Sequence, residues 1–140
     1  MVLINYGFEE VGKWTKENLK NGITFELCKF EKERVVYTFL VDCKIMYLGI
    51  CNNTTTTLKD RMNRYKYRSG KGTNERIADK IKKCLEQGKC VKIFALKLES
   101  TLQYKDLNID LVKGLENPLI EKLKPDWNIQ NVRRKGNSRS

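Results

Sequence analysis

The side chains available for chemistry are limited by an absence, because none of the 140 residues is a histidine. This excludes Ser-His and Cys-His nucleophile systems, histidine-dependent nucleases and zinc sites that need imidazole. Carboxylates, tyrosines, lysines and arginines remain. Hydrolysis of a phosphodiester needs a proton acceptor for the attacking water, positive charge on the phosphate and usually a hard cation on carboxylate oxygens. The remaining residue types can supply all three.

Three residues stand out by their setting, and each also has a structural interpretation. Tyr37 and Tyr47 lie ten residues apart in apolar stretches, and Glu116 is an acid in a leucine-rich segment. Tyrosine pairs in hairpins mostly pack against each other, and a lone glutamate is more often a surface or capping residue. Spacing alone therefore leaves the catalytic and the structural interpretation of all three open.

The positive charge is concentrated in one segment of the chain. The net charge is +11, from 28 Lys and Arg against 17 Asp and Glu, and residues 58–92 alone hold twelve basic and four acidic side chains. Residues 1–34 are balanced, whereas residues 131–140 add four basic groups. A solvated helix surface usually mixes both signs, so this distribution predicts a face that binds a polyanion.

Two helices are predicted in this basic segment. Leu58, Met62 and Tyr65 recur at helical spacing and form the apolar stripe of the first. Thr73 is expected to cap the second helix, and Gly88 to end it. Arg61, Arg64 and Arg68 are expected to share a second face of the first helix, and we predict contacts with a phosphate backbone from Lys59, Arg64, Lys66, Arg68, Arg76, Lys80 and Lys83.

Strands are predicted on either side of these helices. Residues 34–41 and 45–50 are rich in β-branched and aromatic side chains, and Asp42-Cys43-Lys44 between them is typical of the turn of an antiparallel hairpin. Residues 90–98 predict a third strand and residues 24–30 a fourth. Near the C-terminus, leucines at steps of four predict a helix that starts or kinks close to Pro118. The pattern predicts an α+β domain with a small central antiparallel sheet flanked by helices.

The cysteines and the hydropathy favour a reducing compartment. Five cysteines, an odd number without a Cys-x-x-Cys pair, argue against a zinc site and favour reduced, mostly buried thiols. No signal peptide is recognised, and apolar runs fall short of the roughly 18 residues of a membrane span. We therefore expect a cytoplasmic protein without a membrane partner.

Several of these features occur together in one family. A two-part pattern resembles the signature of the GIY-YIG nuclease superfamily. Its parts are residues 35–37 (Val-Val-Tyr) and residues 47–49 (Tyr-Leu-Gly), with nine residues between them. The helix with Arg61 resembles the family's helix with a phosphate-binding arginine, and Glu116 resembles its metal-binding glutamate. Asn128 follows twelve residues later, in the family's usual place. Five elements in the same order are difficult to obtain by chance.

The resemblance implies a DNA endonuclease that uses one Mg²⁺ or Mn²⁺ ion and acts on double-stranded DNA. Glu116 would hold the metal, Tyr37 would be the general base, and Tyr47 would orient water or phosphate. Arg61 would clamp the scissile phosphate, preferably through two hydrogen bonds. A free phenol has a pKa near 10, so the cation and Arg61 would have to lower the pKa of Tyr37 for it to act at neutral pH.

Two further residues take supporting roles in the resemblance. The first signature element lacks its glycine and the second has leucine for isoleucine, but both changes preserve strand character and keep the tyrosines, whereas a third departure, at position 50, is more serious. Tyr65 would support the arginine one helical turn before it, and Asn128 would hold the metal-binding glutamate or the phosphate in place. Ile50 stands where many relatives have a lysine near the phosphate, and Lys59 or Lys66 would have to replace that charge. The departure favours an alternative, a catalytically weak or inactive nucleic-acid-binding module.

The resemblance also implies a division of the chain. We expect residues 1–33 to be an extension used in DNA recognition or oligomerisation, residues 34–131 to be the catalytic domain, and residues 132–140 to be a basic flexible tail. Because one small module presents one active site to one strand, we expect a homodimer or larger homo-oligomer. A third hypothesis, a nuclease of the Pro-Asp…Asp/Glu-x-Lys type, rests on residues 42–44 alone.

Overall fold

The computed structural model of the protein describes residues 1–17, 22–70, 72–98 and 102–128. Its elements along the chain are α1 (Val2–Asn5), β1 (Glu9–Glu17), β2 (Gly22–Leu27), β3 (Val36–Val41), β4 (Lys44–Ile50), α2 (Leu58–Lys66), α3 (Thr73–Glu86), β5 (Val91–Leu96), β6 (Leu102–Tyr104), β7 (Leu107–Ile109) and α4 (Leu111–Leu123). The predicted basic tail, residues 132–140, lies outside the described residues.

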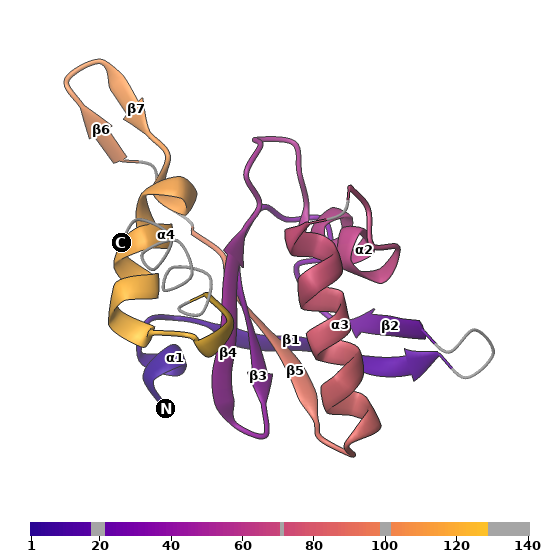
Figure 1. Cartoon of the computed structure of the whole chain (residues 1–140). Helices are drawn as coiled ribbons and strands as arrows, with labels where there is room; N and C mark the ends of the chain where they lie inside the picture. Colours follow the sequence, from indigo (N-terminus) through magenta and orange to yellow (C-terminus); the bar gives the residue numbers. More distant parts are fainter. Residues whose placement is uncertain (18–21, 71, 99–101, 129–140) are drawn as a thin grey trace, which may run out of the picture.

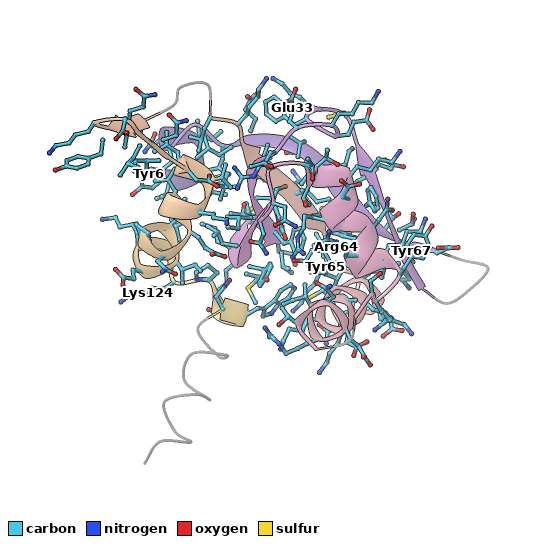
Figure 2. All side chains as sticks on the ribbon, turned by 90° about the horizontal axis from the view of Figure 1, so that it is seen from above. Tyr6, Glu33, Arg64, Tyr65, Tyr67 and Lys124 are labelled. Atoms are coloured by element: carbon cyan, nitrogen blue, oxygen red, sulfur yellow. The ribbon has the colours of Figure 1, made fainter. Side chains whose placement is uncertain are left out.

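The centre of the fold is a five-stranded sheet with the order β2-β1-β5-β3-β4, in which every neighbouring pair is antiparallel. Helices α2 and α3 lie on one side of this sheet, and α4 lies with α1 on the other (Figures 1 and 2). The predicted fold class, α+β with a central antiparallel sheet flanked by helices, is confirmed.

The sheet is buried on both faces at β3, which explains why this strand is apolar along its whole length. Alternate side chains of a strand point to opposite faces. Tyr37 and Phe39 accordingly belong to the core under α2 and α3, whereas Val36 and Leu40 belong to the core under α4. The sheet therefore separates two hydrophobic layers, and the predicted catalytic tyrosine lies in the first.

The hairpin of β3 and β4 differs from the prediction in its turn and register. Asp42 and Cys43 form the turn with φ of +47° and +72°, and Lys44 already pairs with Val41. A bulge then shifts the register, so that Leu40 pairs with Ile45 but Phe39 pairs with Tyr47. Without the bulge, Phe39 would face Met46 and Tyr47 would point to the opposite side of the sheet. The bulge therefore puts both signature tyrosines on one face.

Helix α2 follows its predicted stripe and α3 begins differently. Thr57 caps α2 in a reciprocal capping box, with Asp60 N donating to Thr57 Oγ1 over 3.2 Å and Thr57 N to Asp60 Oδ2 over 3.0 Å. Thr73 is the first residue of α3 rather than its cap, because Gly72, at φ +67°, occupies the cap position without a side chain to bond. Gly88, at φ +79°, follows the end of α3 as predicted.

The prediction that Arg61, Arg64 and Arg68 share one face of α2 is wrong. Arg61 points toward the core tyrosines, and Arg68 lies beyond the end of the helix with φ of +53° and pairs with Asp79 of α3. The two therefore do not form one row with Arg64, because the helical spacing on which that row depends ends at Lys66.

Two strands of the sheet come from the N-terminal segment, β1 (Glu9–Glu17) and β2 (Gly22–Leu27). Strand β1, which was not predicted, lies between β2 and β5, so the N-terminal segment supplies two of the five strands. Phe8, Val11 and Trp14 are 0–2% exposed in the two core layers. Strands on both sides of the expected boundary at residue 33 thus pair in the same sheet. The expected division of the chain and the recognition or oligomerisation role of this segment stay predictions.

The C-terminal region holds a hairpin that was not predicted. Strands β6 and β7 pair with each other and project away from the body of the molecule (Figure 1). Helix α4 then begins at Leu111, capped by Asp110, and continues through Pro118. The helix therefore starts about two turns before the proline rather than near it, and the alternative of a kink near Pro118 stays a prediction.

Two expectations from composition have different outcomes. Of the five free cysteines only Cys51 is buried, while Cys28, Cys43 and Cys90 are exposed, so the expectation of mostly buried thiols is wrong. Cys43 is exposed because it lies at the tip of the β3–β4 turn. Within the described ranges, none of the helices has the length and apolarity to cross a bilayer.

Candidate active site

A solvent-open pocket of about 390 Å³ lies where β4, α2, the start of α3 and α4 approach one another. Its wall contains three of the predicted site residues, Tyr47 from β4, Arg61 from α2 and Glu116 from α4. The other lining residues are Gly49, Ile50, Asn52, Thr73 and Asn74. The three predicted residues are at least 14 positions apart in sequence, so only the fold brings them together.

A pair of buried tyrosines lies behind this wall and is bonded to its arginine. The hydroxyls of Tyr37 and Tyr65 are 2.7 Å apart, and both residues are 0% exposed. Arg61 Nε donates to Tyr37 Oη over 3.1 Å and its Nη2 donates to Tyr65 Oη over 3.0 Å. The guanidinium is thereby held in one orientation by two phenols.

Tyr37 packs closely against Gly49, a residue of the pocket wall. Gly49 lines the pocket and pairs with Tyr37 across the hairpin. A methyl group on the α-carbon of Gly49 would lie 2.6 Å from Tyr37 Oη, closer than real contacts allow. The glycine of the second signature element is therefore required for the phenol of the first to lie against the pocket.

The environment of the tyrosines disfavours their ionised forms. Burial raises the pKa of Tyr37 well above the ordinary value of a phenol, and Tyr47 nearby adds to this, whereas the charge of Arg61 opposes it. Burial likewise raises the pKa of Tyr47, with Tyr65 as the next contribution. Protein groups alone thus keep both phenols protonated at neutral pH, and the charge of Arg61 is the first of the contributions that oppose the rise of the two pKa values.

Glu116 is the acidic residue of the pocket. It lies half-buried in the middle of α4, where burial raises the pKa of its carboxyl and the charge of Arg61 counteracts that rise. Among the described residues, no group of three His, Cys, Asp or Glu side chains gathers to form a metal site. A single carboxylate with amide oxygens nearby nevertheless matches Mg²⁺, which is commonly bound by one or two carboxylates, waters and substrate phosphates.

Asn128 lies at the site but does not contact Glu116 in the described hydrogen bonds. Its Oδ1 accepts from Leu48 N over 2.9 Å, and its Nδ2 donates to Leu48 O over 3.0 Å. Strand β4 is the last strand of the sheet, so Leu48 would otherwise lack a backbone partner on that side. The side chain of Asn128 therefore fixes the strand that carries Tyr47 and Gly49.

The predicted phosphate-contacting cations are distributed over α2 and α3. Arg64 belongs to α2 (Figure 2), and Lys59 and Lys83 are exposed. Arg76 Nη1 donates to the carbonyl of Trp127 over 3.3 Å, and Arg68 is paired with Asp79, so both also have structural partners. Lys66, which lies 5.3 Å from the ring of Tyr67, and Lys80 are half-buried on the same helices.

Ile50 does not supply a charge to the pocket. Its side chain is 4% exposed and packs in the hydrophobic layer under α4. Neither Lys59 nor Lys66 belongs to the described wall, in which Arg61 is the cationic residue. The expected replacement of the lysine by one of these residues is therefore not found in the described pocket.

Sequence reasoning missed three polar residues of the pocket. Asn52 follows β4, and Thr73 and Asn74 open α3; Asn74 Nδ2 donates to the carbonyl of Ser69 over 2.9 Å. The available signal was position, because loops at strand ends and first turns of helices present polar groups to a shared ligand.

The fold is found in solved structures. No protein-family model and no curated protein matches the sequence. The structure of a bacteriophage T4 EndoII mutant is similar with a TM-score of 0.72 at 19% identity, covering 90% of this chain and 95% of that chain. Restriction endonuclease HPY188I in complex with product DNA is similar with a TM-score of 0.52 at 17% identity, covering 86% and 76%. The chain therefore shares the fold of T4 EndoII.

Proposed function

We propose that this chain, which shares its fold with a GIY-YIG nuclease, is an endonuclease that hydrolyses phosphodiester bonds of double-stranded DNA with one Mg²⁺ or Mn²⁺ ion. The observation that carries the proposal is the meeting of Tyr47, Arg61 and Glu116 in one pocket. The sequence resemblance named these three residues independently of the geometry. The net charge of +11, concentrated near α2 and α3, supports a polyanionic substrate.

Glu116 would hold the metal, with Asn52 or Asn74 within the same pocket as further oxygen donors. When bound, the ion neutralises charge on the phosphate and on the leaving 3′ oxygen. Arg61 binds the scissile phosphate from the other side of the pocket. Because two tyrosine hydroxyls accept from Nε and Nη2, the guanidinium keeps its remaining N–H groups for the phosphate.

Tyr37 is the proposed acceptor of the water proton, and Tyr47 orients water or phosphate through its hydroxyl. The contact from Arg61 Nε supports the first role, because a charged donor stabilises a phenolate. Exposure to the pocket supports the second role, because Tyr47 is part of the wall. The reverse assignment, with Tyr47 as the base, would use the more accessible hydroxyl, and paired phenylalanine variants separate the two.

The second candidate is a nucleic-acid-binding module with weak or no catalysis. Ile50 favours it, since the pocket wall has an apolar side chain where many relatives of this family have a lysine. The raised pKa values of both signature tyrosines also favour it, because they keep the hydroxyls protonated and a protonated phenol does not accept the proton of water. This candidate predicts salt-dependent DNA binding without cleavage at any divalent metal.

We also propose that the protein assembles into a homodimer or larger homo-oligomer. One pocket serves one DNA strand, so cutting both strands at one place needs two pockets. Large apolar side chains are exposed on α1 and on the β6–β7 hairpin, where Tyr104 and Leu107 are 62% and 58% exposed. Light scattering of the wild type and of Leu107→Ser tests this; a monomeric wild type, with and without DNA, would contradict it.

Nicking of supercoiled plasmid tests the function. Wild type is expected to nick with Mg²⁺ and not with EDTA, and Glu116→Ala is expected to bind DNA in EDTA but not to nick. Glu121→Ala is the matched control, because Glu121 is an exposed acid on the same helix outside the described pocket wall. Equal nicking by Glu116→Ala would refute the proposed site. Salt-dependent binding without nicking by any of the proteins would establish the second candidate.

A further inference from the structure

Arg34, which sequence reasoning did not single out, makes a dense set of hydrogen bonds between the loop after β4 and the start of α4. Its Nη1 and Nη2 donate to the two carboxylate oxygens of Asp110 over 2.9 and 2.7 Å. Its Nε donates to the carbonyls of Cys51 and Asn53 over 2.8 and 3.0 Å, and Nη2 also donates to the carbonyl of Asn52 over 3.0 Å. The side chain is 19% exposed, so these bonds are largely shielded from water.

Arg34 and Asp110 line a neighbouring pocket, and their link to the active-site pocket runs through one partner that lines it and through the helix that begins at Asp110. Asn52, whose carbonyl accepts from Arg34, lines the pocket after β4. Asp110 is the N-cap of α4, and Glu116 lies six residues further along that helix. Six residues of helix span about 9 Å, so a movement of the N-terminus of α4 is transmitted to the glutamate. Arg34 therefore joins the loop after β4 to the helix that carries Glu116.

The spacing across the pocket depends on how α4 is docked. Arg61 belongs to α2 on one side of the sheet, whereas Glu116 belongs to α4 on the other (Figure 1). The element before α4 is the projecting β6–β7 hairpin, which packs mainly against itself. The described ion pair between Arg34 and Asp110 is thus a strong polar attachment at this end of α4, and it is bidentate.

We propose that Arg34 and Asp110 are positioning residues that set the place of Glu116 for metal binding. The proposal rests on the proposed function of Glu116. It predicts that breaking the ion pair weakens metal binding much more than it lowers the rate at saturating metal, because the catalytic side chains themselves remain. A purely structural ion pair would lower stability without changing the metal requirement.

Asp110 has two roles that substitution can separate. Besides binding Arg34, its Oδ1 accepts from Lys113 N over 3.3 Å and so caps α4. Serine is an equally good N-cap but has neither the charge nor the two oxygens that a guanidinium needs. Asp110→Ser therefore keeps the cap and removes the ion pair. Arg34→Gln removes the pair from the other side and leaves Asp110 intact.

The test uses Arg34→Gln, Asp110→Ser and the double variant that carries both substitutions. Lys44→Gln serves as the control. Lys44 forms the control ion pair, at 2.9 Å with Asp126, and its side chain is 64% exposed. Two quantities are measured for each protein: the Mg²⁺ concentration that gives half-maximal plasmid nicking, and the binding of Mn²⁺ followed by electron paramagnetic resonance in the presence of a short DNA duplex. Thermal unfolding shows whether each variant is folded at the assay temperature.

Either variant is expected to raise the half-saturating Mg²⁺ concentration and the Mn²⁺ dissociation constant about tenfold, with the maximal rate within about threefold of wild type. The double variant is expected to equal Arg34→Gln, because that substitution already removes the contact that Asp110→Ser breaks. Lys44→Gln should change neither constant. Unchanged metal constants in folded Arg34→Gln and Asp110→Ser would overturn the proposal while leaving the nuclease function intact.

The metal titration also separates failure of this proposal from failure of the proposed function. A wild type that binds Mn²⁺ but does not cut DNA would contradict the endonuclease, and weaker Mn²⁺ binding by Asp110→Ser would still support the positioning role. A wild type that binds no Mn²⁺ with the duplex present would overturn the positioning role together with the metal site.

Discussion

The α-carbon of Gly49 lies directly under the phenol of Tyr37, so close that an added methyl group would be 2.6 Å from the ring's Cζ and from its hydroxyl oxygen. The two residues pair across the β3–β4 hairpin. A side chain at position 49 would have to push the tyrosine away from Arg61, whose Nε is 3.1 Å from the same oxygen. The conformation of Tyr37 and the identity of residue 49 are therefore coupled.

Gly49→Ala is expected to impair both stability and activity. Overpacking of a closed core usually costs about 1–3 kcal/mol, and the displaced phenol would lose its contact with Arg61. Chemical unfolding and plasmid nicking measure the two effects. Gly114→Ala is the control, because nothing surrounds that position of α4 within 4 Å and alanine favours a helix by about 0.5–1 kcal/mol. Full activity of a stable Gly49→Ala protein would contradict the coupling.

The dependence of the nicking rate on pH is expected to identify the base. Because burial raises the pKa of Tyr37, its phenolate is the minor form at neutral pH. As long as the pH is below this pKa, the fraction of phenolate increases tenfold for each unit by which the pH rises. The logarithm of the rate should therefore rise with a slope of about 1 between about pH 6 and 9. Tyr37→Phe should lose this slope together with most of the rate, whereas Tyr47→Phe should keep the slope at a lower rate. The opposite pattern would transfer the role of base to Tyr47.

Asn128 is expected to affect catalysis through β4. Asn128→Asp keeps an acceptor for Leu48 N but loses the donor to Leu48 O, so it leaves two oxygens facing each other at the edge of the sheet. The free energy of unfolding should fall by about 1–3 kcal/mol, and the nicking rate should fall at saturating Mg²⁺. Asp126→Asn, two residues earlier, is the control. An unchanged metal requirement in the variant distinguishes this role from direct support of Glu116.

The Arg34–Asp110 pair predicts a dependence of stability on pH. The hydrogen bonds and charge of Arg34 lower the pKa of Asp110 below its ordinary value. The ionised carboxylate is therefore stabilised in the folded protein, and this stabilisation is fully present above the unfolded pKa near 4 and is lost as the pH falls through the lower folded pKa. Urea unfolding between about pH 2 and 6 should show a smaller pH dependence for Asp110→Asn than for wild type. Equal slopes would indicate that the carboxyl titrates alike in both states.

DNA binding in EDTA is expected to depend on individual cations of α2 and α3. The exposed Lys83 is free to move toward a phosphate, and Lys83→Ala should reduce the dependence of log K on log salt by about one unit. Arg68→Ala should have a smaller effect, because Arg68 is paired with Asp79. Fluorescence anisotropy at several salt concentrations measures both. A larger effect for Arg68 would place the DNA on the surface between the two helices.

Parts of the fold that depend on local periodicity were predictable from the sequence. The apolar stripe of Leu58, Met62 and Tyr65 is buried as predicted, because residues three and four apart share one side of a helix whatever it packs against. The β3–β4 hairpin was predictable from residue type instead, since β-branched and aromatic residues favour strands. Strand β1, rich in charged residues, lacked such a pattern, and its partners in the sheet decide its conformation.

The residue types available for the site also follow from the sequence alone. The absence of histidine left tyrosine, arginine and glutamate as the groups for hydrolysis, and the order of Tyr37, Tyr47, Arg61 and Glu116 matched that of a known family. Asn128 was identified from the sequence, but its partner Leu48 was not. A hydrogen bond between residues 80 positions apart depends on how the segment after α4 packs against β4.

Tertiary structure decided which of these side chains meet. A hairpin turn at residues 42 and 43 without a bulge would put Tyr37 and Tyr47 on opposite faces of the sheet, and the register shift after Phe39 brings them to one face. Likewise, Arg34 bonds to Cys51 and Asp110 only because the fold brings the loop after β4 and the start of α4 close to its guanidinium. The physical reason is the same in both cases: periodicity determines which face of an element a residue occupies, but register and docking, set by contacts distant in sequence, determine what that face meets.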